Sequence, residues 1–288
     1  MNEQETTRLR LDVSYDGTDF SGWSRQPGLR TVEGTLNEAL ETLFSRSGSV
    51  PALTVAGRTD AGVHALGQVV HLDLTDVQLA SLRGRSGRDS PAESLARRIN
   101  GIAGLQSDVF VERSSIAPPG FDARFSAIWR RYEYRVADAA APRNPLLRNH
   151  TVWFPAALDV EAMNVAAESL TGLHDFASYC KPREGATTIR TLQRFEWSRQ
   201  SDGLLVARLQ ADAFCHSMVR ALVGATVAVG QGKLSADDVV TLREAAERTS
   251  AFKVMPARGL ALVEVGYPEV DELAVRAEQT RAKRALEV

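Results

Sequence analysis

The chain has 288 residues, and its formal net charge at pH 7 is −2, with 34 Lys and Arg against 36 Asp and Glu. Hydrophobic residues make up 44% of the chain and charged residues 24%, enough for a substantial core in one large or two medium domains. No apolar run approaches the roughly 18 residues of a membrane span, and the first ten residues do not form a signal peptide. We therefore expect a soluble cytoplasmic protein. The near-neutral charge is not that of a strongly basic nucleic-acid binder, although 34 cations can still line a basic cleft.

Metal and disulfide chemistry find little support in the sequence. Cys180 and Cys215 form neither a CxxC pair nor a metal-ligand spacing. They indicate a reducing compartment and two packed or unused thiols. His64 and His71 match no zinc pattern, so we interpret His64 as shaping a loop and His71 as a structural residue.

The first part of the chain alternates strands, helices and turns. Apolar and polar residues alternate from Arg8 to Tyr15, which predicts a half-buried strand that ends in a turn at Asp16-Gly17. Similar patterns predict a helix over 31–45, short apolar runs at 52–55 and 69–74 around a loop, a helix over 91–102 and a strand at 109–111. Residues 81–91 are rich in Ser, Gly and Arg, and form either a solvated loop or an arm that contacts phosphates.

The second part begins with another strand pattern, in which Tyr132, Tyr134 and Val136 share one face and predict core-facing aromatic rings. The pattern then predicts a Pro-containing connector at 138–150, helices over 158–170 and 237–246, a strand over 204–209 that leads into an apolar helix, and a closing strand at 262–265. We expect an N-terminal half at 8–112, a C-terminal half at 113–268 and a solvated tail at 269–288 that is either helical or frayed.

The loop between the two early apolar runs, Gly57 to His64, concentrates polar chemistry in a few residues. Gly57 and Gly62 permit a tight turn, and strand-mounted loops are common places for catalytic groups. By residue type alone, Asp60 is either a turn cap with Arg58 as its ion-pair partner, or a catalytic carboxylate.

Five separated segments of the chain carry distinctive motifs. They are YDGTDFSGWS from Tyr15, GRTDAGVHALGQVVHLDL from Gly57, ARFSA with RRYEYR from Ala123, FCHSMVRALVG from Phe214 and PARGL from Pro256. In this order they resemble the TruA family of tRNA pseudouridine synthases, and the resemblance decides between the two interpretations of Asp60. Ser24 stands where the family pattern has Gln.

The resemblance implies a role for each matching residue. Asp60 is the expected nucleophile, and Arg220 is its expected partner, with Arg58 as a possible second partner. Tyr132 is expected to pack its ring against the target uracil, which suits an aromatic face that holds a flipped base. Phe20 and Trp23 either pack under the turn or form a wall of the RNA cleft.

The resemblance also implies an α/β (α+β) fold of two related halves, each with a largely antiparallel sheet flanked by helices, and an active-site cleft between them. The implied reaction converts uridine to pseudouridine at positions 38, 39 and 40 of the tRNA anticodon stem-loop, without cofactor or metal, in a homodimer. Attack at uracil C6, attack at ribose C1′ and a glycal route stay open.

Two rival functions remain. A catalytically inactive tRNA-binding paralogue has no need to retain Asp60, Tyr132 and Arg220 together. A glycosidase or nucleoside hydrolase uses paired carboxylates, and no second acid occupies an obvious partner position.

Overall fold

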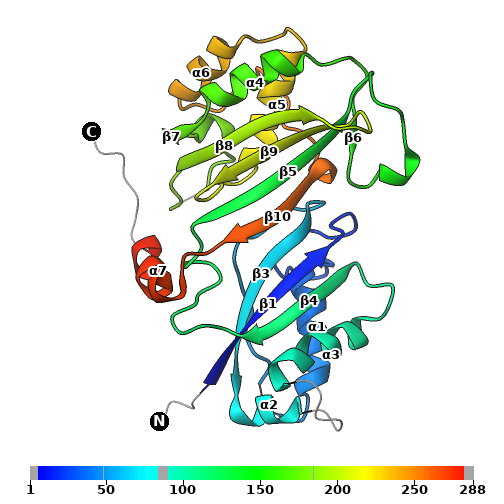
Figure 1. The fold of residues 1–288 in the computed structure, drawn as a ribbon, viewed down its shortest axis with the longest axis vertical. Helices are drawn as coiled ribbons and strands as arrows, with labels where there is room; N and C mark the ends of the chain where they lie inside the picture. Colours follow the sequence, from blue (N-terminus) through cyan, green and yellow to red (C-terminus); the bar gives the residue numbers. More distant parts are fainter. Residues whose placement is uncertain (1–5, 48, 84–89, 184, 282–288) are drawn as a thin grey trace. The chain divides into compact units, whose positions relative to one another are not determined.

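The structure is a computed structural model that describes residues 6–47, 49–83, 90–183 and 185–281. Its contacts divide the chain into two compact units (Figure 1). Unit 1 runs from the first described residue to Ala127 and resumes at Val265–Arg281, whereas unit 2 is Ile128–Glu264. Mostly antiparallel strands and flanking helices confirm the expected α/β (α+β) class. The expected boundary at 113 falls inside a strand of unit 1, and the units divide after Ala127 instead.

Unit 1 is built around an antiparallel sheet with strand order β4-β1-β3, to which β2 adds beside β3. The buried side of β1 carries Leu9, Leu11 and Val13, each fully buried, as its alternating pattern predicts. The strands are β1 (Thr6–Tyr15), β2 (Thr54–Val55), β3 (His64–Thr75) and β4 (Val109–Ile116).

Three helices accompany the sheet of unit 1 (Figure 1), of which the two longer ones bury one mainly apolar face each, while the shortest buries Gln78. They are α1 (Val32–Phe44), α2 (Asp76–Ser81) and α3 (Pro91–Ala103). Ser90 begins α3 with a capping box to Glu93. On the same helix, the Asn100 side chain donates to Val111 O and accepts from Val111 N, both at 2.8 Å, so that one amide satisfies both backbone groups of a residue on the outermost strand. The Arg-rich segment 84–89 lies outside the described residues.

The C-terminal segment of unit 1 is packed, which corrects the expected solvated tail for residues 269–281. It contains η4 (Val270–Glu272) and α7 (Leu273–Arg281). Leu273 and Ala277 are buried on one face of α7, and Ser126 Oγ donates to Leu273 O at 3.0 Å. Arg281 bonds Asp122 at 3.2 Å, so α7 is fixed to the turn that precedes unit 2.

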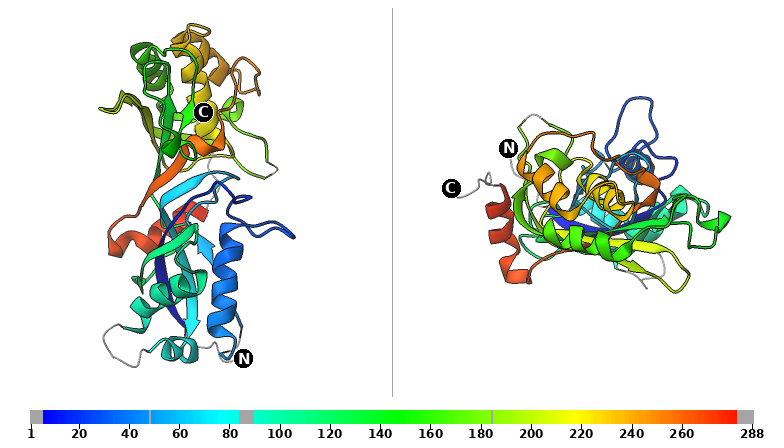
Figure 2. Two further views of the ribbon diagram at one scale, coloured as in Figure 1. Left: turned by 90° about the vertical axis from the view of Figure 1, so that its right-hand side faces the viewer. Right: turned by 90° about the horizontal axis from the view of Figure 1, so that it is seen from above.

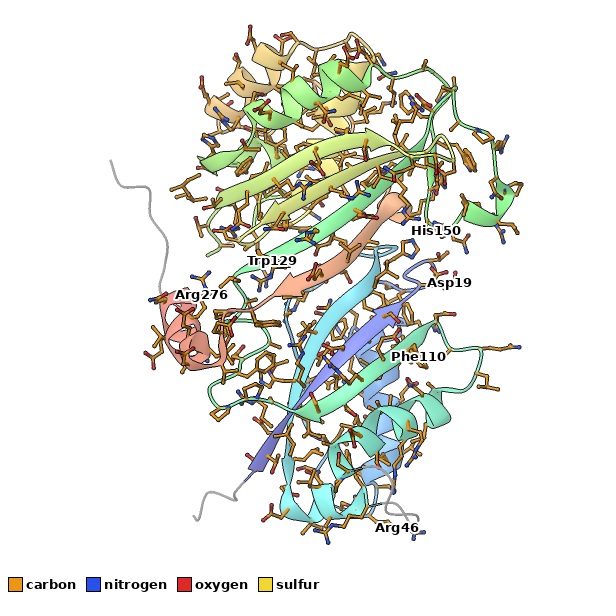
Figure 3. All side chains as sticks on the ribbon, viewed as in Figure 1. Asp19, Arg46, Phe110, Trp129, His150 and Arg276 are labelled. Carbon is orange, nitrogen blue, oxygen red and sulfur yellow. A yellow bond between two sulfur atoms is a disulfide. The ribbon has the colours of Figure 1, made fainter. Side chains whose placement is uncertain are left out.

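Unit 2 has a five-stranded sheet in the order β10-β5-β9-β8-β7, with β6 pairing in parallel beside β5. Side chains of β5 alternate between a buried face and a face of charged residues that form ion pairs, such as Arg131 with Glu264. Arg131 also lies over the ring of Trp129, at the start of the strand (Figure 3). The strands are β5 (Trp129–Ala137), β6 (Val152–Trp153), β7 (Gly172–Asp175), β8 (Ile189–Arg199), β9 (Leu205–Ala211) and β10 (Leu260–Gly266).

Three helices of unit 2 gather against the other face of its sheet (Figure 2). They are α4 (Val160–Ser169), α5 (Met218–Gly230) and α6 (Ala236–Glu244), with 3-10 turns η1 (Pro145–Leu147), η2 (Ala177–Tyr179) and η3 (Ala257–Gly259) in the connections. Every residue of α5 except Arg220 is buried, which explains why its sequence is apolar all round.

Cys180 and Cys215 are joined in a disulfide, with their Cα atoms 5.8 Å apart. The prediction of two thiols is therefore wrong. The bond links the end of η2 to the segment before α5, and 35 residues separate the two positions along the chain.

A buried histidine makes unit 1 sensitive to acid. His71 Nδ1 accepts a hydrogen bond from Ala123 N at 3.0 Å, as expected for a structural residue. Burial and then the nearby charge of Arg8 lower the pKa of His71 from its ordinary value near 6.5, against the opposing effect of Asp122 and Asp73.

Because the unfolded chain binds this proton more readily than the folded chain, the free energy of unfolding falls as the pH drops below about 6.5. Urea unfolding at pH 7.5, 6.5 and 5.5 measures the effect. His71→Leu lowers stability at every pH but flattens the dependence relative to wild type. An unchanged pH dependence in the variant would contradict this assignment.

The packing of α7 gives a second prediction. Leu273→Ala removes a side chain that is only 2% exposed, and we expect it to lower the free energy of unfolding by about 2–5 kcal/mol. Val275→Ala on the same helix is the matched control, because Val275 is 55% exposed and its loss costs about 0.5 kcal/mol or less. Equal effects in urea unfolding would show that α7 does not pack as described.

Candidate active site

Asp60 lies in the loop between β2 and β3 of unit 1. Ala56 N donates to Val69 O at 2.8 Å and fixes the start of the loop, while Val63 N donates to Asp60 O at 3.1 Å and closes a turn around Ala61-Gly62. Gly62 has φ +76°, a left-handed conformation that favours glycine. Asp60 is half-buried, whereas Arg58 is exposed.

The segment after β1 holds this loop from one side. Trp23 N donates to Thr59 O at 3.0 Å, and Gly62 N donates to Phe20 O at 3.2 Å. Gly22 has φ +96°, and a Cβ there would lie 3.0 Å from Thr59 O, so the two backbones approach as closely as glycine permits. Asp19 lies in the turn between the end of β1 and Gly22 (Figure 3). The loop that carries Asp60 is therefore supported by backbone bonds on both sides of the carboxylate.

Phe20 and Trp23 are 3% and 1% exposed. Of the two interpretations made for these rings, the structure favours packing under the turn. Trp23 contacts the ring of Tyr15 with centroids 6.1 Å apart, and Phe20 lies under the guanidinium of Arg30 at 4.2 Å.

His64 begins β3 and joins the far end of the loop to the turn after β1. Its Nδ1 accepts from Gly17 N at 3.0 Å, and the residue is 7% exposed. A Cβ at Gly17 would overlap the carbonyl of Val63, so a larger residue at position 17 requires the loop to move. His64 shapes the loop, as expected.

Tyr132 lies on β5 in unit 2, opposite Leu209 of β9. Its ring meets the ring of Phe214 edge to face, with centroids 5.1 Å apart, and the residue is 8% exposed. Tyr134, two residues on, is fully buried and donates to Pro256 O at 2.7 Å. The prediction that both rings face the core is confirmed.

Arg220 is in the first turn of α5 and is the helix residue that is not buried. Its Nε donates to Met255 O at 2.6 Å, and Met255 N donates to Arg220 O at 3.1 Å, so the segment before η3 holds both ends of this residue. Burial raises the pKa of the Tyr134 hydroxyl, while the positive charges of Arg220 and Arg258 oppose that effect.

The sequence-predicted residues thus fall into two sets. Asp60 and Arg58 share one loop of unit 1, and Tyr132 and Arg220 belong to unit 2. The pairing of Asp60 with Arg220 and the stacking role of Tyr132 join residues of different units and stay predictions. Three neighbours of these residues were not predicted from the sequence, namely Phe214, Met255 and Arg258. Two of them, Phe214 and Arg258, lie inside the segments that resemble the family.

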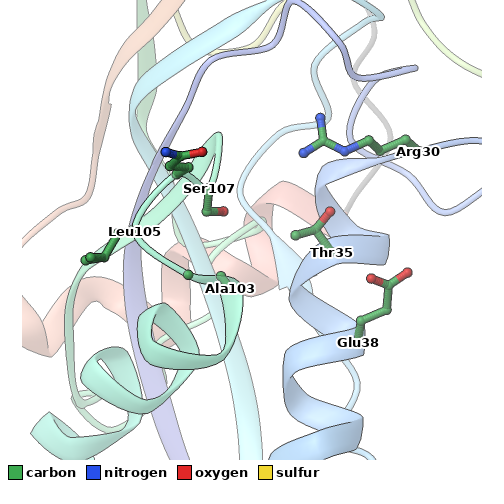
Figure 4. A pocket seen from close by; sticks show the side chains of 8 residues that line it. Arg30, Thr35, Glu38, Ala103, Leu105 and Ser107 are labelled. Carbon is green, nitrogen blue, oxygen red and sulfur yellow. The ribbon is translucent and has the colours of Figure 1, made fainter.

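A separate cavity of about 550 Å³ lies between α1 and the turn after α3 (Figure 4). It holds none of the predicted site residues, and is lined by Arg30, Thr35, Glu38, Ala103, Gly104, Leu105, Gln106 and Ser107. Among the residues that the structure describes, no three His, Cys, Asp or Glu side chains gather as a metal site. Within the same described ranges, no helix combines the length and the apolar character that a membrane crossing requires.

Comparison with known proteins identifies the class of enzyme. The model of a tRNA pseudouridine synthase family matches residues 166–268. The chain is 63% identical to a protein of Leifsonia xyli subsp. xyli over 98% of this chain and 99% of the relative. It is 53% identical to a protein of Frankia casuarinae over 96% and 95% of the two chains, and 46% identical to one of Mycobacterium leprae over 99% and 98%.

With this identity over nearly its full length, the chain belongs to the pseudouridine synthases that act on tRNA, a family of isomerases. Within that family, the three relatives are each named tRNA pseudouridine synthase A.

Proposed function

We propose that this chain isomerises uridines 38, 39 and 40 of the tRNA anticodon stem-loop, with Asp60 as the nucleophile and no cofactor. The observation that supports it most is the loop of Asp60, which holds a half-buried carboxylate between backbone hydrogen bonds on both sides. Such support is what a short acid needs if it must be aimed at one atom of a bound nucleotide.

The reaction breaks the N1–C1′ bond of uridine, turns the base and forms a C5–C1′ bond. The hydrogen at C5 leaves to solvent and N1 gains a proton, so the isomerisation is balanced without a group donor or a redox partner. The target base must first leave the helical stack, which costs a few kcal/mol. Tyr132 presents an aromatic ring for the flipped base, and Asp60 attacks C6 or C1′ or assists a glycal route.

In this proposal Arg220 stabilises the ionised form of Asp60, because a cation beside a carboxylate favours its charged state. The bond from Arg220 Nε to Met255 O orients that guanidinium from within unit 2. Arg58, which is exposed on the loop of Asp60, is the second cation we assign to the RNA or to Asp60.

Replacing the nucleophile tests the proposal. We expect Asp60→Asn to keep tRNA binding but to lower the rate by at least about 1,000-fold, as removal of a nucleophile does in other enzymes. Tritium release from tRNA labelled at uridine C5 measures the reaction directly. Asp76→Asn, an exposed carboxylate at the start of α2, is the control and keeps the wild-type rate.

Two outcomes would contradict this assignment. No tritium release by wild type on undermodified tRNA that still binds would favour the catalytically inactive tRNA-binding paralogue. Wild-type release by Asp60→Asn would show that Asp60 is a structural turn residue.

The ring of Tyr132 gives a further test. Tyr132→Phe keeps the edge contact with Phe214, and we expect its rate to stay within about tenfold of wild type if stacking on the base is its role. Tyr132→Ala loses the ring and most of the activity, and thermal unfolding of this variant separates the loss of stacking from the loss of packing. If the Tyr132→Phe variant is as inactive as Tyr132→Ala, the hydroxyl of Tyr132 is the essential group.

We also propose that the protein works in the cytoplasm as a homodimer that binds tRNA. Sedimentation equilibrium without RNA should then give twice the 31.4 kDa mass of the chain. A monomer at micromolar concentration would count against the dimer without affecting the chemistry assigned to Asp60.

A further inference from the structure

A buried chain of side-chain hydrogen bonds reaches the residue before Asp60. The Tyr15 hydroxyl, at the end of β1, lies 2.8 Å from Thr59 Oγ1. Gln68 of β3 donates from Nε2 to Gly57 O at 2.8 Å and to the Tyr15 hydroxyl at 3.2 Å. Tyr15, Thr59 and Gln68 are 5%, 6% and 0% exposed.

In this series of hydrogen bonds every donor of the Gln68 amide has an acceptor, and its oxygen has a donor. Both N–H groups of the Gln68 amide are used by Gly57 O and by the Tyr15 hydroxyl, and Gln68 Oε1 accepts from Val69 N at 3.2 Å. The Tyr15 oxygen accepts from Gln68, and a second hydrogen bond joins it to Thr59 Oγ1, in which either hydroxyl can donate. A buried amide and phenol arranged in this way hold one another in a single geometry.

The burial of Tyr15 also favours a role for its phenol as a neutral hydrogen-bond partner over a role in proton transfer. Burial raises the pKa of Tyr15 to about 12, although its hydrogen bonds to Thr59 and Gln68 oppose the shift. The phenol is thus neutral at physiological pH, and hydrogen bonds join it to both Gln68 and Thr59.

We propose that Tyr15 and Gln68 are positioning residues, which set the place of the Asp60 carboxylate by holding Gly57 and Thr59 from within the core of unit 1. The inference rests on the proposed function, because it presumes that Asp60 is the nucleophile. In this proposal the hydroxyl of Tyr15 affects the reaction rate by positioning the Asp60 loop. The ring of Tyr15, which packs on Trp23, contributes to the stability of the fold. A displacement of about 1 Å at a reacting group can cost about 100-fold in rate.

Removing single hydroxyl groups tests this assignment. Tyr15→Phe keeps the ring, and Thr59→Val keeps the shape of the side chain, but each breaks the bond between them. We expect each variant to lower the single-turnover rate at saturating tRNA by about 10- to 100-fold while the Kd for tRNA changes less than twofold. Thr59→Ser retains a hydroxyl and should recover most of the rate.

Tyr179→Phe is the matched control. Tyr179 is 1% exposed, and its hydroxyl donates to Val239 O of α6 at 2.7 Å, so its loss removes an equally buried hydrogen bond that does not touch the Asp60 loop. Thermal unfolding of all variants shows which of them remain folded at the assay temperature. We expect Tyr179→Phe to lose stability comparable to Tyr15→Phe and to keep its rate.

The outcomes separate the two proposals. If Tyr15→Phe and Thr59→Val turn over at the wild-type rate while Asp60→Asn is inactive, the positioning role is wrong and the proposed function stands. If the rate of Tyr15→Phe falls no further than that of Tyr179→Phe, the hydroxyl is structural only. If wild type releases no tritium from C5-labelled tRNA, the proposed function itself fails.

Discussion

The antiparallel register between β1 and β3 is the constraint on which unit 1 depends. It pairs Leu9 with Leu72 and Leu11 with Val70, and a slip of one residue would turn the buried face of β1 toward solvent. Beyond Val13, which pairs with Gln68, the register shifts, so that Tyr15 pairs with Ala65. One extra residue on β3 is thereby accommodated beside the site, where bulges commonly redirect side chains. This local shift allows Tyr15 and Gln68 to meet under the Asp60 loop.

Much of this arrangement was predictable, because it depends on sequence patterns within single loops and strands. Gly62 beside Asp60, the alternation in β1 and the paired tyrosines of β5 each mark their own local structure, and all three were interpreted correctly. Gly57 was not, because its φ is not left-handed and a Cβ there would meet nothing within 4 Å. The role of Tyr15 beyond packing was not predictable. Its partners Thr59 and Gln68 lie 44 and 53 positions away in the sequence, and a strand pattern says which face is buried but not which hydroxyl meets which amide.

The errors have similar physical causes. The six residues of α2 are too few to show a helical period. Only Leu273 and Ala277 of α7 are buried, four residues apart in a charged segment, so no apolar stripe distinguishes this helix from a solvated tail. The pairing of Cys180 with Cys215 depends on how η2 and the start of α5 meet, which neither spacing nor composition reveals. The bond of Arg220 to Met255 is equally non-local, because 35 positions separate the two residues.

The side chain of Asn100 has a consequence for how this protein avoids unwanted association. A terminal strand normally offers unpaired N–H and C=O groups to any extended chain that approaches it. On β4 the Asn100 amide occupies both groups of Val111, and Glu112 and Arg113 beside it are exposed and charged. An incoming strand would have to displace that amide and desolvate those charges. At Val111 the edge of the unit 1 sheet is thus blocked by an amide from its own helix α3, which opposes edge-to-edge growth of the sheet at this point.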